Sequence, residues 1–96
     1  MKELFVPAAA RRDVNSIEVL RVWIAGEGLH VSLLAGAWED PETWGILLAD
    51  LARHIANAYE QEMLLDPAET LSRVRALFDA ELDSPTDYPR GSIVAN

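Results

Sequence analysis

Cysteine is absent from the 96 residues. Its absence excludes disulfide bonds, thiolate metal ligands and a cysteine nucleophile. Basic residues are also few, with eight lysines and arginines against sixteen aspartates and glutamates and a formal net charge of −8. Because proteins that bind nucleic acid need a positively charged surface, we expect no nucleic-acid partner.

Long apolar runs are missing as well. No segment approaches the roughly eighteen uninterrupted apolar residues of a membrane span. The short apolar stretch at the N-terminus is broken by Pro7, and Arg11 and Arg12 follow it instead of preceding it, unlike a secretion signal. We therefore expect a cytoplasmic protein without a membrane partner.

Half of the residues are apolar, which is enough for a folded chain. The length suits one small domain. We therefore expect a single domain over residues 1–96, with residues 1–16 as an extended arm and residues 86–96 as a loose tail. The tail gains structure only if Ser92–Ala95 docks as a strand.

Two segments alternate with a period of two, Ile17–Ala25 and Leu29–Leu34, and this alternation predicts two β-strands. Between them, Gly26 suits the first central position of a type II′ turn. That turn fixes the register of the hairpin. The predicted pairs are Leu20 with Leu33, Arg21 with Ser32, Val22 with Val31, Trp23 with His30, Ile24 with Leu29, and Ala25 with Gly28.

Two helices are predicted after the hairpin. Asp40 and Pro41 suit the N-cap and the first turn of a helix that runs to about Glu62. Its apolar residues recur at spacings of three and four, and beside them lies a column of small residues that suits close packing on the sheet or on another helix. The members of the column are Gly45, Ala49, Ala52 and Ala56.

The second helix has clear boundaries. Asp66 is a suitable N-cap, Pro67 a suitable first residue, and Glu69 occupies the acidic position of a capping box. Ser84 and the following proline end it. The chain thus has a predicted α+β fold, a β-hairpin followed by two α-helices in the order β-β-α-α.

The hairpin has apolar residues on both faces. If the helices cover one face, the other still carries Ile17, Val19, Trp23 and Leu34. A homodimer that forms a larger sheet or a sheet stack would cover them, as would the chain's own tails. We expect the homodimer, with Val19, Trp23 and Leu34 as interface candidates.

Candidate chemistry is sparse. Asp50 and His54 lie four residues apart on a helix, where both could reach one metal ion, but a metal site normally has three or four protein ligands. The pattern equally suits a solvated surface pair. No serine lies in a nucleophile-elbow motif, and the turn glycines are not a phosphate-binding loop. We predict no catalytic residue, no metal site and no cofactor.

Polar and aromatic residues around the first helix are the remaining candidates for a surface or pocket. Tryptophan is frequent at binding hot spots, although in a small domain it is also a large core residue. Glutamate and aspartate beside two tryptophans would need separated pKa values for acid–base chemistry. The candidates are Trp38, Glu39, Trp44, Asp50, Arg53, His54 and Asn57.

Two stretches of the sequence resemble a known family. They are Glu18–Ile24 with Gly28–Leu33, and Trp38-Glu39-Asp40-Pro41 running through Trp44-Gly45 to Ala58. They are similar to a family of small uncharacterised alphaproteobacterial proteins, a domain of unknown function, over about residues 13–62. The resemblance implies a bacterial cytosolic source and no catalytic residue.

We expect a non-catalytic interaction or assembly module that acts as a homodimer. It would present the Trp23 face of the sheet and the polar face of the first helix. A small-molecule-binding or regulatory protein with a pocket at Trp38 and Trp44 is the alternative, and a small enzyme is a third class.

Overall fold

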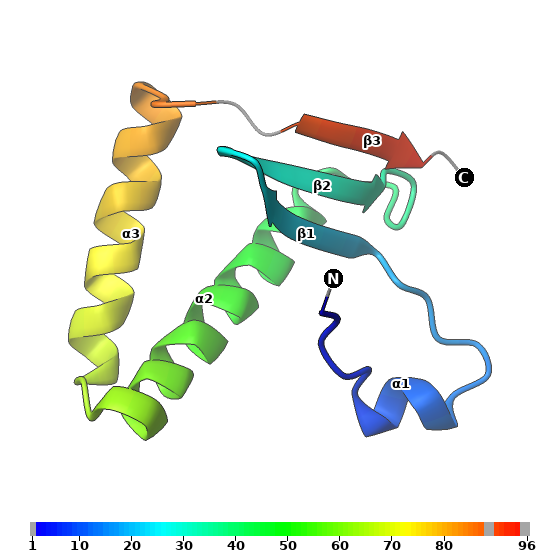
Figure 1. The fold of residues 1–96 in the computed structure, drawn as a ribbon, viewed down its shortest axis with the longest axis horizontal. Coiled ribbons are helices and arrows are strands. Elements are labelled where there is room, and N and C mark those ends of the chain that lie inside the picture. Colours follow the sequence, from blue (N-terminus) through cyan, green and yellow to red (C-terminus); the bar gives the residue numbers. More distant parts are fainter. Residues whose placement is uncertain (1, 88–89, 95–96) are drawn as a thin grey trace. The chain divides into compact units, whose positions relative to one another are not determined.

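The computed structural model describes residues 2–87 and the backbone of residues 90–94. Over these residues, three helices and three strands follow one another along the chain (Figure 1). In chain order they are α1 (Ala8–Arg12), β1 (Leu20–Ala25), β2 (Gly28–Leu34), α2 (Thr43–Met63), α3 (Pro67–Asp83) and β3 (Arg90–Val94). The α+β class and the hairpin followed by two helices are confirmed.

The hairpin forms in the predicted register. All six predicted pairs, from Leu20 with Leu33 to Ala25 with Gly28, are present in antiparallel β1 and β2. Gly26 has a φ of 60°, a conformation that glycine adopts without steric cost. Glu27 does not share that positive φ, so the turn fits type II′ and not type I′.

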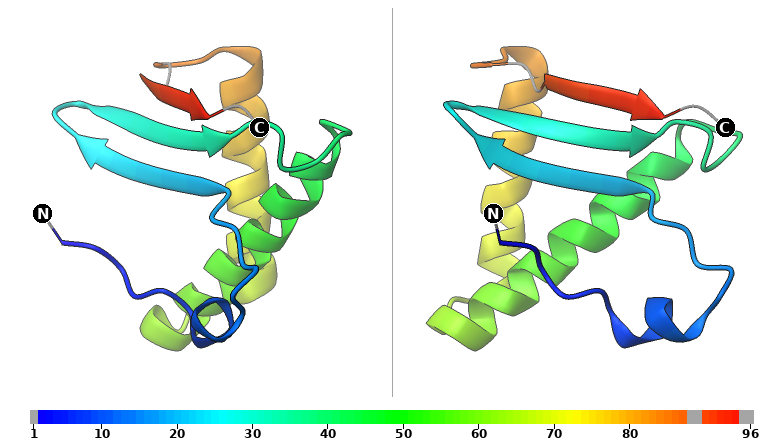
Figure 2. Two further views of the ribbon diagram at one scale, coloured as in Figure 1. Left: turned by 90° about the vertical axis from the view of Figure 1, so that its right-hand side faces the viewer. Right: turned by 45° about the vertical axis from the view of Figure 1, so that its right-hand side comes forward.

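The C-terminal segment corrects the expectation of a loose tail. Residues Arg90–Val94 form β3, which pairs in parallel with β2 and completes a sheet of order β1-β2-β3 (Figure 2). Parallel neighbours require a crossover connection, and here α2 and α3 supply it. Part of the strand considered at Ser92–Ala95 lies outside the described residues, since Ala95 is not described.

The N-terminal segment is not extended throughout, so the predicted arm is wrong in part. Ala8–Arg12 form one helical turn, because alanine and arginine favour helix. The Ser16 hydroxyl donates a hydrogen bond of 2.8 Å to the carbonyl of Ala10, which ties the turn to the chain ahead of β1.

The start of α2 differs from the prediction. The helix begins at Thr43, and Glu42 occupies the N-cap without a side-chain hydrogen bond. Asp40 therefore does not cap α2. Its backbone carbonyl accepts a hydrogen bond of 3.1 Å from the Thr43 N–H. Because the two residues are three positions apart, Asp40–Glu42 form a tight turn ahead of the helix.

The boundaries of α3 are as predicted. The Asp66 carboxylate accepts a hydrogen bond of 3.0 Å from the Glu69 N–H, Pro67 is the first helical residue, and Ser84 is the C-cap. Between the helices, Leu64 adopts the left-handed conformation with φ 58°. Its N–H bonds the carbonyl of Glu60 at 3.0 Å, which is the αL form of helix termination.

The chain divides into two compact units. The sheet unit comprises Met1–Ala37 with Arg90–Asn96, and the helical unit comprises Trp38–Pro89. Within the helical unit, α2 and α3 meet at their turn and diverge away from it (Figure 1). The single domain over residues 1–96 stays a prediction.

Candidate interaction surfaces

Few residues are buried over residues 2–87. Only Gly28, Ala56 and Thr70 are buried there, while large apolar side chains such as Phe5 and Ile24 are 99% and 87% exposed. Exposed apolar side chains also lie in the helical unit, where Ile46 and Leu82 are 64% and 67% exposed.

The helical unit packs tightly only beside its turn. Ala56 of α2 is 3% exposed and Thr70 of α3 is 8% exposed, and each lies within two helical turns of the connection. Within the small-residue column, Ala56 thus packs beside α3, one of the two predicted alternatives, whereas Gly45 and Ala49 are exposed. Farther from the turn, Leu48, Leu51 and Phe78 remain exposed because the helices diverge.

An apolar groove of about 500 Å³ runs between α2 and α3 on one side of the helical unit. We name it the hairpin groove, after the helical hairpin that α2 and α3 form; it is not part of the β-hairpin. The charged residues that line it are Arg53, Arg75 and Asp79. The apolar residues include Leu48, Ala49, Ala52, Leu71, Val74 and Phe78.

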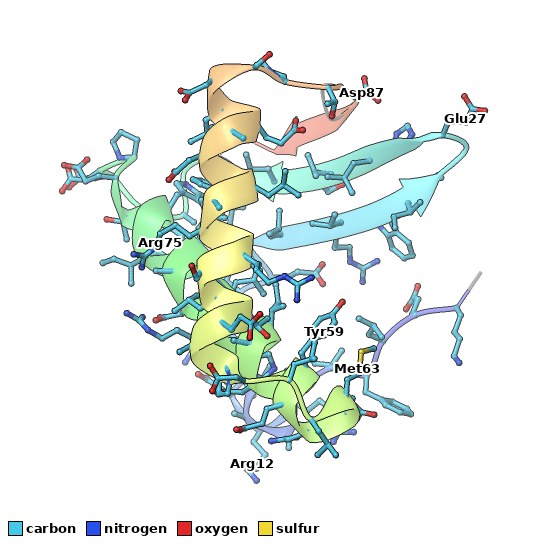
Figure 3. All side chains as sticks on the ribbon, turned by 90° about the vertical axis from the view of Figure 1, so that its left-hand side faces the viewer. Arg12, Glu27, Tyr59, Met63, Arg75 and Asp87 are labelled. Atoms are coloured by element: carbon cyan, nitrogen blue, oxygen red, sulfur yellow. The ribbon has the colours of Figure 1, made fainter. Side chains whose placement is uncertain are left out.

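A second hollow of about 670 Å³ involves the same two helices. Ile55, Val74 and Phe78 line both hollows, while Arg73 and Leu77 line only the second. Residues 73 and 75 lie about 200° apart around a helix. The two hollows therefore lie on opposite sides of the contact between α2 and α3. Near the turn, Tyr59 and Met63 mark the end of α2 (Figure 3).

Trp23 lies on the sheet face that carries the interface candidates. Its side chain is half-buried, and the Arg21 guanidinium carbon lies 5.9 Å from the centroid of its ring, within range of a cation–π interaction. Arg21 Nε also donates a 2.8 Å hydrogen bond to Glu18 Oε1. This hydrogen bond and the Glu18 charge raise the pKa of Arg21 above its ordinary value.

Val19 and Leu34 lie at the end of the hairpin that is remote from the turn. The Leu34 N–H donates to the Val19 carbonyl at 3.0 Å, and both residues are half-buried. The hydrogen bond places them side by side, and Val19 lies four residues before Trp23 along the chain. Because strand side chains alternate, Val19 and Trp23 lie on the same face of the hairpin, about 13 Å apart.

Trp38 and Trp44 contact each other. Their ring centroids are 5.0 Å apart and the planes meet at 83°, the edge-to-face arrangement that aromatic pairs favour. Trp38 is 36% exposed, and Glu39 beside it is exposed. Each tryptophan covers part of the other, so the pair stabilises the turn that leads into α2.

The polar residues of α2 form an exposed surface. Arg53 Nη1 lies 3.5 Å from Asp50 Oδ1, with both side chains about two-thirds exposed or more. The Asp50 partner is thus Arg53, three residues on, and such exposed pairs contribute little stability. His54 and Asn57 are exposed on the same helix. Over residues 2–87, no three side chains of the metal-binding types gather around a common point.

The hairpin groove contains residues that the sequence prediction missed. Arg75, Phe78 and Asp79 belong to α3, for which no site residue was predicted. Their spacing on a helical face was visible in the sequence. The divergence of the two helices, which leaves Phe78 47% exposed, was not.

Among the described helices, none is long and apolar enough to cross a membrane. The family model described as a domain of unknown function (DUF5076) matches residues 3–86. No protein of curated function matches the chain.

A solved structure from the photosynthetic bacterium Rhodopseudomonas palustrus CGA009 is similar to the chain. It is named a "putative pyruvate dehydrogenase". The two chains share 40% sequence identity with a TM-score of 0.72, and the match covers 92% of this chain and 90% of that chain.

Proposed function

Because the chain belongs to the family defined by the domain of unknown function DUF5076, we propose a function from its own surfaces: it is a non-catalytic assembly module that acts as a homodimer. The extent of exposed apolar surface carries this proposal. Large apolar side chains are exposed in both units, among them Ile24 at 87% in the sheet unit and Leu82 at 67% in the helical unit. Burial of such side chains against a second copy is the main favourable contribution to association.

The module offers two kinds of surface to other molecules. On the sheet, Val19, Trp23 and Leu34 form a half-buried apolar group, and tryptophan is among the residues that contribute most to binding energy. On α2, the exposed residues Asp50, Arg53, His54 and Asn57 form a polar surface. We assign the apolar group to contact with protein and the polar surface to the solvated rim.

The molecular mass in solution tests the homodimer. The untagged protein is passed through size-exclusion chromatography with light scattering at micromolar concentration. We expect a mass of about 21 kDa, twice the 10.6 kDa of one chain, because association covers the exposed apolar side chains. A mass of 10.6 kDa across the concentration range contradicts the proposal.

A small-molecule-binding protein is the second candidate, and the hairpin groove favours it. Its volume of about 500 Å³ lies within the range of ligand pockets. Native mass spectrometry of protein purified from its source distinguishes the two classes. An added mass of a few hundred daltons on each chain indicates a ligand, whereas a doubled mass alone indicates the homodimer. The enzyme class is supported only by the name of the Rhodopseudomonas structure.

A further inference from the structure

We infer that the hairpin groove binds a second copy of this chain. The α3 helices of the two copies pack antiparallel to each other across a twofold axis. The inference rests on the proposed homodimer and names the surface that holds it together. It leaves the sheet group of Val19, Trp23 and Leu34 free for a different protein.

The exposed face of α3 has the pattern of a helix–helix contact. Leu71, Arg75, Phe78 and Leu82 recur at spacings of four, three and four, which places them on one face. Phe78 and Leu82 are 47% and 67% exposed because α2 diverges from α3 at this level. Over the described residues of the helical unit, Phe78 and Leu82 therefore have little packing against α2.

The charges on this face are complementary to themselves under twofold symmetry. In an antiparallel pair with its axis level with residue 77, Arg75 of each copy lies opposite Asp79 of the other, and Leu71 lies within one residue, about 1.5 Å along the helix, of the position opposite Leu82. A twofold interface requires this reciprocity. Over residues 2–87, neither Arg75 nor Asp79 forms an ion pair within the chain, so both charges are available.

The groove has the shape to receive a helix. On the α2 side its lining includes Gly45, Ala49 and Ala52, and a Cβ added at Gly45 would meet no atom within 4 Å. Small side chains let two helices approach closely. The α3 of a second copy can therefore lie between α2 and α3, with its own apolar stripe against the groove.

Charge reversal tests the register. We expect Asp79→Arg to place two arginine pairs across the axis and to raise the dimer dissociation constant about tenfold or more. The single reversal Arg75→Asp has the same expected effect through two carboxylate pairs. In the double variant Arg75→Asp with Asp79→Arg the attractive pairs are restored, so the mass measured by light scattering returns to that of the wild-type dimer.

Two control variants make the test specific. Arg73→Asp makes the same charge change on the opposite side of α3, where Arg73 lines the second hollow, and Trp23→Ala removes the main sheet candidate. Both are expected to remain dimeric. Circular dichroism of every variant checks that the helices persist.

The outcomes separate the inference from the proposed function. A monomeric wild-type protein, whose groove is then covered by its own chain or by a small ligand, overturns both. A dimeric wild type whose single reversals stay dimeric overturns the inference alone. The inference is also overturned if each single reversal dissociates the dimer and the double variant does not restore it. The charges would then act without the proposed pairing of Arg75 with Asp79.

Discussion

Leu64 has a backbone conformation that leucine rarely adopts. With a φ of 58° it lies in the left-handed region, where the clash of Cβ with the backbone costs about 1–2 kcal/mol, and helices commonly end there with glycine. Its side chain is 89% exposed, so no burial compensates for this cost within one chain. Residues kept in such conformations often take part in binding.

Replacing Leu64 with glycine tests the strain. We expect Leu64→Gly to raise the free energy of unfolding by up to about 1 kcal/mol in chemical denaturation, since the left-handed conformation becomes unstrained while little buried surface is lost. The adjacent substitution Met63→Gly is the control. It introduces glycine into the last turn of α2 and should lower the free energy of unfolding by about 0.5–1 kcal/mol. A loss of stability from both variants contradicts the account of Leu64.

The elements most accurately predicted from the sequence are those fixed by local interactions. The hairpin register follows from alternation and from Gly26, and the start of α3 follows from Asp66 and Pro67. Both depend on residues within a few positions of one another. The hairpin register and the start of α3 could therefore be predicted from neighbouring residues alone.

The elements that the prediction missed or left open are short or depend on distant pairing. Ala8–Arg12 is too short to show helical periodicity, and β3, considered at Ser92–Ala95 as an alternative to a loose tail, forms by pairing with a strand some sixty positions earlier. The hairpin groove was likewise not predicted, although the small-residue column was recognised. A groove depends on the angle between α2 and α3, and sequence periodicity gives the face of each helix without that angle.

The third strand is predicted to stabilise the hairpin. Two-stranded sheets are marginal in water, and β3 pairs with the edge of β2 that β1 leaves open. Removing residues 85–96 should therefore increase amide hydrogen exchange throughout β1 and β2, while amides in the middle of α2 and α3 keep their protection. Unchanged exchange in the hairpin would show that β3 adds no stability to it.

For the whole molecule, the proposed homodimer predicts that stability depends on protein concentration. A hundredfold dilution changes the free energy of a dimer by about 2.7 kcal/mol, or about half of that per chain. For a chain of this size we expect Tm to fall by about 5–10 °C. Differential scanning calorimetry at two concentrations measures the shift, and the Arg73→Asp variant should show the same dependence. A Tm that does not change with concentration would contradict a dimer.

The parallel pairing of β2 with β3 has a consequence for biosynthesis. His30 is paired with Arg90, so the ribosome must add both helices before the second edge of β2 gains its neighbour. At about 5–20 residues per second, the 55 residues between Leu34 and Arg90 take roughly 3–11 s. During those seconds the nascent chain displays an open β-strand edge, the kind of surface that chaperones bind and that aggregation begins from.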